Sequence, residues 1–447
     1  MRRAGTPVRR LLLAISAPVA GAVLPGGLAG AGQDMFLTLQ SELFTNVTVI
    51  DGRGGPPRPS SSVLVWGGRI QGIGAQGSVP APEGTIVVDL SGSYLIPGFI
   101  DAHASPRTTD DLRALLAAGI TGVRDGATSL AAFEARGRGG FGEDPVPAVY
   151  IGGPVLDAGS GTRGAGPDSE AAAIAEVARQ AADGAGFVSV ASSVPPSWLV
   201  GIARAARRAD VPLWADRRDG GWLLALRAGS AVASPLVSGD AELLPESERA
   251  PFEALADAGQ VPVQAAWLER LDPHGPDVDR AVTALLSNDS ALLPLLAGAS
   301  APLDCPAEAA TCAPLSAAGR TALEAVWPKA EALVQTFHGH GVRLLVGSDA
   351  PRTTPWGEGF HREMQLLVEA GIPPLEVLGM ATRNGAIALG QLHERGTIEI
   401  GKRADFLVLE ANPVADIRNA RRISLVVVDG RAWTLGPNDT WRRVRFN

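Results

Sequence analysis

Lysine and histidine are scarce in this 447-residue chain. Lysine occurs only at positions 329 and 402, so arginine carries nearly all of the positive charge. The six histidines stand at positions 103, 274, 338, 340, 361 and 393. A metal site that uses histidine must therefore draw on very few residues. A site that needs a lysine at any other position is excluded.

The chain also lacks any long block of like charge, and its formal net charge is −8. This balance argues against nucleic acid and anionic membranes as partners. Hydrophobic residues make up 46% of the chain and charged residues 19%, which is typical of a folded globular protein. The length is too great for one small core, so we expect two domains.

No apolar run reaches the ~20 residues that a membrane-spanning helix needs. Instead, a basic start that includes Arg9 and Arg10 precedes the apolar stretch Leu11 to Leu24, and Ala29-Gly30-Ala31 offers small residues for cleavage. This layout predicts a secretory signal peptide over residues 1–31 and an exported protein, periplasmic or extracellular, without a stable membrane anchor. The alternative is a single uncleaved anchor.

Cys305 and Cys312 are the only cysteines. An exported protein meets oxidising conditions, so a disulfide that closes this short loop is one interpretation. Two unrelated thiols are the other. The pair lacks the tight spacing and the companion ligands of a zinc site.

Segments at both ends of the chain read as short strands joined by turns. Val47 to Ile50 and Val63 to Val65 near the start are mostly β-branched, as are Phe406 to Leu409 and Ile423 to Val428 near the end. We expect residues 37–97 and 395–447 to form one small β-sandwich domain. Between these segments, we expect residues 98–394 to form an α/β domain, a (β/α)8 TIM-like barrel.

The barrel prediction rests on eight strand-like runs, each followed by sequence rich in alanine and leucine. These runs are Leu95–Ile100, Gly122–Arg124, Ala148–Ile151, Phe187–Val190, Val211–Ala215, Ala231–Ser234, Pro262–Ala266 and Leu344–Gly347. In such a barrel, binding and catalytic residues follow the strands directly.

Several ordered motifs resemble those of the amidohydrolase superfamily, closest to its imidazolonepropionase-like and prolidase-like branch. They include Pro97-Gly98-Phe99-Ile100-Asp101-Ala102-His103, Ala118-Gly119-Ile120-Thr121-Gly122-Val123-Arg124-Asp125 and Gly347-Ser348-Asp349-Ala350-Pro351. The resemblance implies a hydrolase of non-peptide carbon-nitrogen bonds, as in amides, cyclic amides or dipeptide-like compounds. It also implies a metal pair, because a bound ion lowers the pKa of water and makes a nucleophile.

Most of the metal ligands that the resemblance implies are missing. His103 and Asp349 match the family pattern, but Ser105 stands where a second histidine would be and Ser189 where the family often has a carboxylated lysine. Asp216 stands in place of a histidine after the fifth strand. Ser234 or Pro235 stands in place of another after the sixth. The sequence therefore predicts that the usual binuclear metal site is largely lost.

Three interpretations stay open for this altered site. His103, Asp216 and Asp349 could hold one divalent ion, zinc or manganese, with Asp349 as the catalytic base. Alternatively, the protein binds no metal and is an inactive, exported barrel that binds a ligand or partner, with His103 and Asp349 as retained pocket residues. Metal-free hydrolysis is the third.

His361, Arg163 and Arg217 are candidate substrate-binding residues. His361 matches a position near the barrel mouth in relatives, and the two arginines fall in predicted mouth loops, where they would favour a carboxylate-bearing ligand. The alternatives are a histidine bonded to backbone at a helix start and ordinary surface arginines. We expect a small molecule as the partner, and a homo-oligomer is compatible with the sequence.

Overall fold

The computed structural model describes residues 40–126, 145–159, 166–217, 221–258, 263–304, 315–351, 354–436 and 440–446. The predicted signal peptide, Arg163, Cys305 and Cys312 lie outside these ranges. Export and the disulfide therefore remain predictions.

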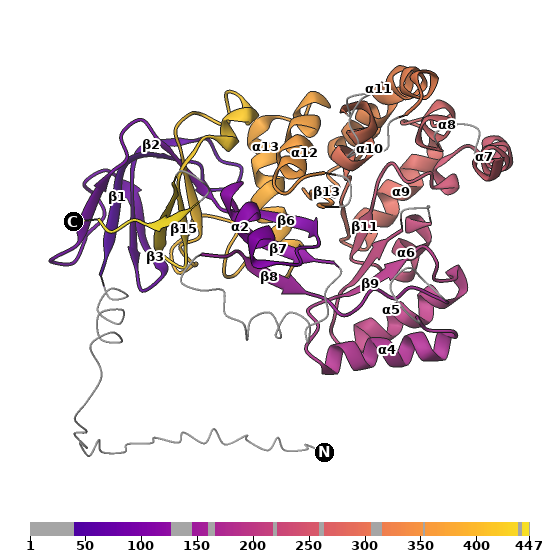
Figure 1. Ribbon diagram of the computed structural model, residues 1–447, viewed down its shortest axis with the longest axis horizontal. Coiled ribbons are helices and arrows are strands. Elements are labelled where there is room, and N and C mark those ends of the chain that lie inside the picture. Colours follow the sequence, from indigo (N-terminus) through magenta and orange to yellow (C-terminus); the bar gives the residue numbers. More distant parts are fainter. Residues whose placement is uncertain are drawn as a thin grey trace, which may run out of the picture. The chain divides into compact units, whose positions relative to one another are not determined.

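Strands from both ends of the chain form one nine-stranded sheet (Figure 1). Its strands are β1 (Glu42–Val49), β2 (Arg58–Trp66), β3 (Arg69–Ala75), β4 (Ile86–Asp89), β5 (Tyr94–Pro97), β14 (Phe406–Leu409), β15 (Ile423–Val428), β16 (Arg431–Leu435) and β17 (Trp441–Arg443). The two ends meet where β5 pairs antiparallel with β14. Apolar side chains such as Phe44, Val63 and Phe406 fill one shared core.

Two tight turns fix the register of this sheet. β2 and β3 join through Gly67 and Gly68, and β15 and β16 join through Asp429 and Gly430. All four residues have positive φ, between 52° and 75°. A two-residue hairpin of this twist requires positive φ at both central positions, which explains the glycines and the aspartate.

Eight further strands are all paired in parallel, in two sheets. One holds β6 (Phe99–Ala104), β7 (Ile120–Asp125) and β8 (Ala148–Ile151); the other holds β9 (Val188–Ala191), β10 (Leu213–Asp216), β11 (Val232–Ser234), β12 (Ala291–Leu292) and β13 (Arg343–Leu344). Backbone hydrogen bonds link the sheets at both edges, from Gly186 N to Ile151 O (2.9 Å) and from Ala102 N to Val346 O (2.9 Å). The expectation of a mixed α/β fold with parallel sheets is confirmed.

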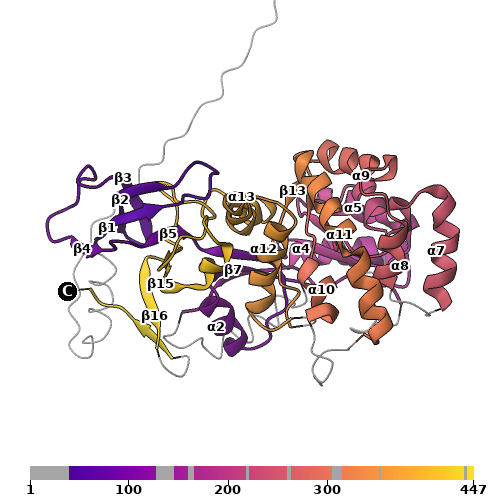
Figure 2. The same cartoon turned by 90° about the horizontal axis from the view of Figure 1, so that it is seen from above.

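Helices lie between the parallel strands along the chain, and the last three described α-helices follow β13 (Figures 1 and 2). They are α2 (Thr109–Ala117), α4 (Glu170–Ala182), α5 (Leu199–Arg208), α6 (Trp222–Ala228), α7 (Glu246–Ala258), α8 (Val263–Arg270), α9 (Pro276–Ser287), α10 (Leu296–Asp304), α11 (Ala317–Gly339), α12 (Glu358–Glu369), α13 (Pro374–Gly379) and α14 (Gly385–Ala388). Within the described part of the chain, none is both long and apolar enough to cross a membrane.

One predicted strand was wrong. Pro262–Ala266 was expected to be the seventh strand, but the helix α8 begins at Val263 and buries Ala265, Ala266, Trp267 and Leu268 on its way to Arg270. A short apolar run can belong to either element, and here the following leucine, glutamate and arginine favour a helix. The seventh strand is instead β12, whose two residues are too few to stand out in the sequence.

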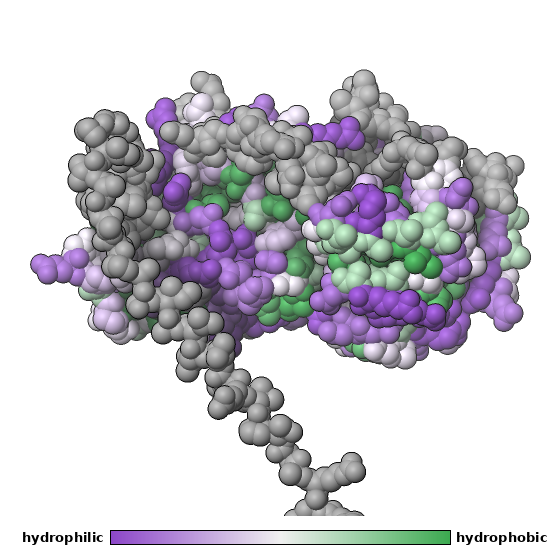
Figure 3. Space-filling model, turned by 90° about the horizontal axis from the view of Figure 1, so that it is seen from below, coloured by the Kyte–Doolittle hydropathy of each residue, from purple (hydrophilic) through white to green (hydrophobic). Residues whose placement is uncertain are grey.

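The parallel strands lie in the hydrophobic core. Every residue of β6 and β7 is buried, as expected of parallel strands covered on both faces. The large apolar side chains that stay exposed belong to separate elements, for example Trp66 in β2, Val200 in α5 and Leu286 in α9. On the face in Figure 3, apolar residues form bands between hydrophilic ones. Scattered exposure of this kind does not by itself mark an interaction surface.

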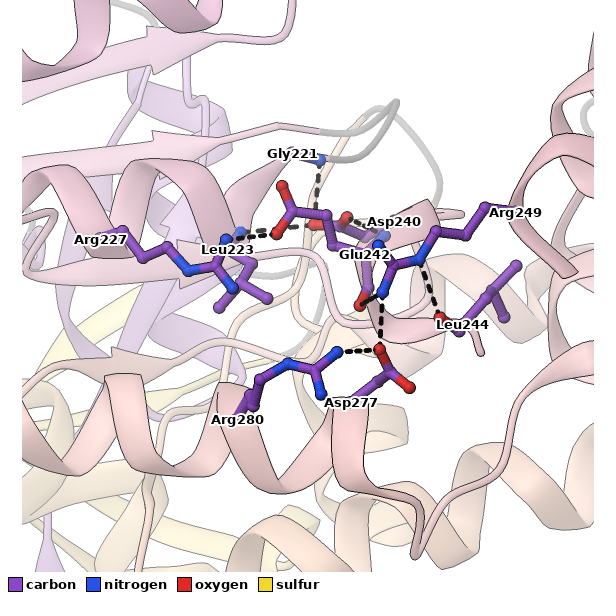
Figure 4. Close-up of polar contacts among 9 residues, drawn as sticks. All are labelled: Gly221, Leu223, Arg227, Asp240, Glu242, Leu244, Arg249, Asp277 and Arg280. Carbon is purple, nitrogen blue, oxygen red and sulfur yellow. Dashed lines mark hydrogen bonds and ion pairs between the residues drawn. The ribbon is translucent and has the colours of Figure 1, made fainter. Parts of the chain in front are cut away.

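A buried aspartate ties the segment after β11 to the start of α6. Asp240 Oδ2 accepts hydrogen bonds from Gly221 N (3.0 Å) and Leu223 N (3.3 Å), and its Oδ1 accepts one from Glu242 N (3.0 Å). Figure 4 shows these contacts beside the ion pairs Arg227–Glu242 and Arg249–Asp277. Because α6 follows β10, Asp240 fixes the helix that begins just beyond the end of that strand.

Replacing Asp240 with alanine leaves three backbone N–H groups without this acceptor. We expect Asp240→Ala to lower the free energy of unfolding by about 1–3 kcal/mol. Urea denaturation followed by circular dichroism measures the change. Asp416 caps a 3-10 helix through an exposed hydrogen bond from Arg418 N and serves as the control, so Asp416→Ala should shift the midpoint far less. Equal shifts for the two variants would contradict this assignment.

Candidate functional site

Three of the residues singled out in the sequence meet at the carboxyl ends of the parallel strands. His103 lies near the end of β6, Asp216 ends β10 and Asp349 follows β13. His103 Nε2 is 3.5 Å from Asp349 Oδ1 and 3.7 Å from Asp216 Oδ2. We call these three residues the His103 cluster. In α/β folds, this end of the strands is where binding sites form.

The backbone around the His103 cluster is held by hydrogen bonds between β6 and the segment after β13. Asp349 N donates to His103 O (2.8 Å), while Asp101 Oδ1 accepts from His103 N (2.9 Å) and from Ser348 N (3.0 Å). Burial raises the pKa of Asp101 to about 7. Asp349 has a φ of 54°, an unfavourable backbone conformation for aspartate that often marks functional positions.

Arg124 contacts the cluster and was not singled out in the sequence. It stands next to the end of β7 and is 1% exposed. Its Nη1 lies 3.1 Å from His103 Nδ1, and its Nη2 donates to Ser189 Oγ at 2.5 Å. Its guanidinium carbon lies 4.3 Å and 4.1 Å from the ring centres of Phe187 and Trp214. The sequence did contain a feature that could have identified Arg124, because a charged residue near the end of a buried strand is unusual.

The guanidinium of Arg124 remains a cation at neutral pH. Burial lowers its pKa to about 10, and the negative charges of Asp216, Asp125 and Asp101 act in the opposite direction. The centre of the site therefore carries a permanent positive charge supplied by the protein itself.

The hydrogen bond from Arg124 determines which nitrogen of His103 carries the proton. Arginine has only donors, so His103 Nδ1 must be the acceptor, and the proton of the neutral ring sits on Nε2. Nε2–H then faces the carboxylates of Asp216 and Asp349. Each ring nitrogen of His103 is thus engaged with a group of the protein.

This arrangement does not fit a metal ion. An imidazole that binds metal presents a lone pair to the ion and donates its other N–H to an acceptor, but here Nε2 carries the proton and Nδ1 faces a donor. Among the described residues, no group of three or more histidine, cysteine, aspartate or glutamate side chains could hold a metal ion. The residues predicted to hold one zinc or manganese ion are close together, but the hydrogen bond from Arg124 leaves a proton on the Nε2 atom that such an ion would need.

The predicted substrate-binding residues lie apart from these contacts. His361 Nε2 bonds Ala118 O at 2.9 Å, and burial lowers the pKa of this histidine to about 4. Arg217 donates to backbone carbonyls of the segment after β9, at Ala191 (2.9 Å) and Val194 (3.2 Å). Arg163 lies outside the described residues.

Buried polar atoms near the strand ends that have no hydrogen-bond partner within the described ranges include Trp214 Nε1 and Ser234 Oγ. Trp214 faces Arg124, and Ser234 pairs in register with Asp216. Buried polar atoms are nearly always satisfied, so such atoms are available to a bound molecule or to water.

Comparisons with known proteins agree with the fold. Residues 310–433 match the amidohydrolase family. Matching solved structures include a Xaa-Pro dipeptidase with bound methionine (TM-score 0.69, 17% identity, covering 88% of this chain and 100% of the other). Phenylurea hydrolase B (0.65, 21%, 88% and 96%) and A. niger ochratoxinase (0.67, 17%, 89% and 96%) also match. No curated protein sequence matches.

At these identities the solved structures establish a shared fold. The family match runs from before α11 through β13, β14 and β15 and ends within β16. Together they confirm the resemblance to the amidohydrolase superfamily that the sequence motifs predicted.

A second buried acid, Glu363, holds the segment just beyond β12 by a hydrogen bond. Glu363 in α12 is fully buried, and its Oε2 accepts a hydrogen bond from Ala297 N (2.7 Å) at the start of α10, just beyond β12. Burial raises its pKa from 4.5 to about 7, against the opposing effect of the backbone N–H groups. The folded protein therefore binds a proton here more tightly than the unfolded chain does.

This raised pKa predicts a stability that falls with pH. Between about pH 4.5 and pH 7 the folded state holds more protons at Glu363, so its stabilisation is complete at low pH and is lost as the pH rises. Glu363→Gln removes this dependence and should gain about 1–3 kcal/mol relative to the parent between pH 5 and pH 8. Urea denaturation at pH 5 and at pH 8 measures this difference in the free energy of unfolding. Exposed Glu324 is the control, and a Glu363→Gln profile parallel to that of Glu324→Gln would refute the assignment.

Proposed function

We propose that this chain is an exported protein of amidohydrolase fold that binds a small molecule at the His103 cluster without a metal pair. One observation carries the proposal: Arg124 donates to the ring nitrogen that a metal-binding His103 would need for its second hydrogen bond. Without an ion, nothing in the described site lowers the pKa of water as metals do in hydrolases of this kind.

The polar groups at the site favour a neutral or zwitterionic ligand with both donors and acceptors. Asp216 is the most exposed member of the cluster, at 17% of its side chain, and accepts hydrogen bonds. Trp214 Nε1–H offers a donor without a described partner. The solved structures of similar fold are named for dipeptides, phenylureas and ochratoxin, so compounds with amide-type bonds are the class to test.

A further part of the proposal concerns the architecture of the chain. We propose that the eight parallel strands form a (β/α)8 barrel over residues 98–394, supported by the hydrogen bonds that join β8 to the segment just before β9 and β6 to the segment just after β13. The nine-stranded sheet would fold over its single core as a sandwich-like domain from residues 37–97 and 395–447, supported by the apolar side chains shared by both parts. Residues 1–31 would direct export.

Metal-independent hydrolysis of a carbon-nitrogen bond is the second candidate. It is favoured by Asp349, whose carboxylate is 4% exposed, lies 3.5 Å from His103 and sits on a backbone with positive φ. A carboxylate in this place could accept a proton from attacking water, while Nε2–H of His103 would hold an oxygen of the substrate. The two candidates share a site and differ in whether product forms.

A binding screen separates them. Purified mature protein should contain no stoichiometric zinc or manganese by elemental analysis, and it should bind at least one compound from a panel of dipeptides, lactams, cyclic amides and ureas by calorimetry. Asp216→Asn removes one acceptor charge and should weaken that binding by about tenfold. Asp289→Asn, at an exposed ion pair with Arg343, is the control.

Product analysis of the same panel decides between the candidates. Binding without turnover supports the ligand-binding role. Turnover that Asp349→Asn lowers by about 100-fold or more supports the second candidate. A stoichiometric ion whose removal abolishes turnover would overturn both.

A further inference from the structure

Arg124 is a buried charge whose hydrogen-bond partners are neutral. It contacts a ring nitrogen of His103 and the hydroxyl of Ser189, and among the described residues no carboxylate forms an ion pair with it. A desolvated cation with neutral partners is costly, so the structure must hold it in place. The rings of Phe187 and Trp214 do so by cation-π contact, since the guanidinium carbon lies over both rings.

We infer that Arg124 is the resident cation of this site and that it prevents a divalent ion from binding. This inference rests on the metal-free site proposed above and identifies its cause. Two effects act together. The fixed charge repels a dication from the carboxylates of the His103 cluster, and the hydrogen bond to His103 Nδ1 leaves the proton on Nε2, the nitrogen that faces those carboxylates.

The small side chain of Ser189 allows this arrangement. The resemblance aligned Ser189 with the lysine that bridges two metals in many relatives, and the structure places its hydroxyl 2.5 Å from Arg124 Nη2. A serine in β9 thus leaves room for the guanidinium and accepts one of its hydrogen bonds. Arg124 and Ser189 work as a pair, one supplying the charge and the other an anchor for it.

The test is whether removing the guanidinium creates a metal site. Arg124→Met keeps an unbranched apolar side chain and frees both His103 Nδ1 and the carboxylates from the positive charge. We expect the parent to take up no stoichiometric Mn²⁺ or Zn²⁺, and Arg124→Met to bind one ion per chain. Its affinity should exceed that of the parent by on the order of 100-fold in calorimetry.

Two control variants test whether the gain in metal affinity comes from the His103 cluster. Arg343→Met removes an arginine at an exposed ion pair with Asp289 and should behave as the parent does. Arg124→Met combined with His103→Gln should lose the ion again. A folded Arg124→Met variant that stays free of metal overturns the inference and leaves the proposed function standing. A stoichiometric ion in the parent protein overturns both.

A measurement on the parent protein covers the case in which Arg124→Met does not fold. In protein labelled with ¹⁵N at histidine, nuclear magnetic resonance distinguishes a protonated ring nitrogen from one that accepts a hydrogen bond. The signals of His103 are identified by their loss in His103→Gln. We expect an acceptor at Nδ1 and a proton at Nε2. The opposite tautomer would show that Arg124 does not set the state of this ring.

Discussion

The hydrogen bond from Arg124 to His103 determines what the rest of this site can do. It fixes the tautomer of the only histidine in the His103 cluster, and it places a permanent cation beside the carboxylates at the strand ends. Metal hydrolases obtain the same local charge from an ion that also activates water. A guanidinium supplies positive charge but does not lower the pKa of a bound water as an ion does.

The fold brings these residues together from distant parts of the chain. His103, Arg124, Ser189, Asp216 and Asp349 come from five strands or strand ends. Because the strands are parallel, their carboxyl ends meet at one edge, and side chains more than two hundred residues apart come within 4 Å. Asp101, Asp240 and Glu363 then fix the segments beyond the strands by accepting backbone N–H groups.

Sequence patterns predicted the elements whose signals are local. β-branched runs marked strands of the nine-stranded sheet, and the resemblance to amidohydrolase motifs marked His103 and Asp349. β12 was missed because two residues carry no periodicity, and its place was wrongly given to α8. The role of Arg124 could not be read from the chain, because it depends on contacts with Phe187, Ser189 and Trp214 in other strands.

Electrostatics explains why carboxylates remain where metal ligands are missing. Asp101, Asp125 and Asp216 all act on the Arg124 cation, and without it their negative charges would repel one another in a buried region. The guanidinium, in cation-π contact with Phe187 and Trp214, therefore stabilises the folded strand ends. Since this charge belongs to the protein itself, the strand ends keep their arrangement without an ion, which is the condition that the proposed metal-free site requires.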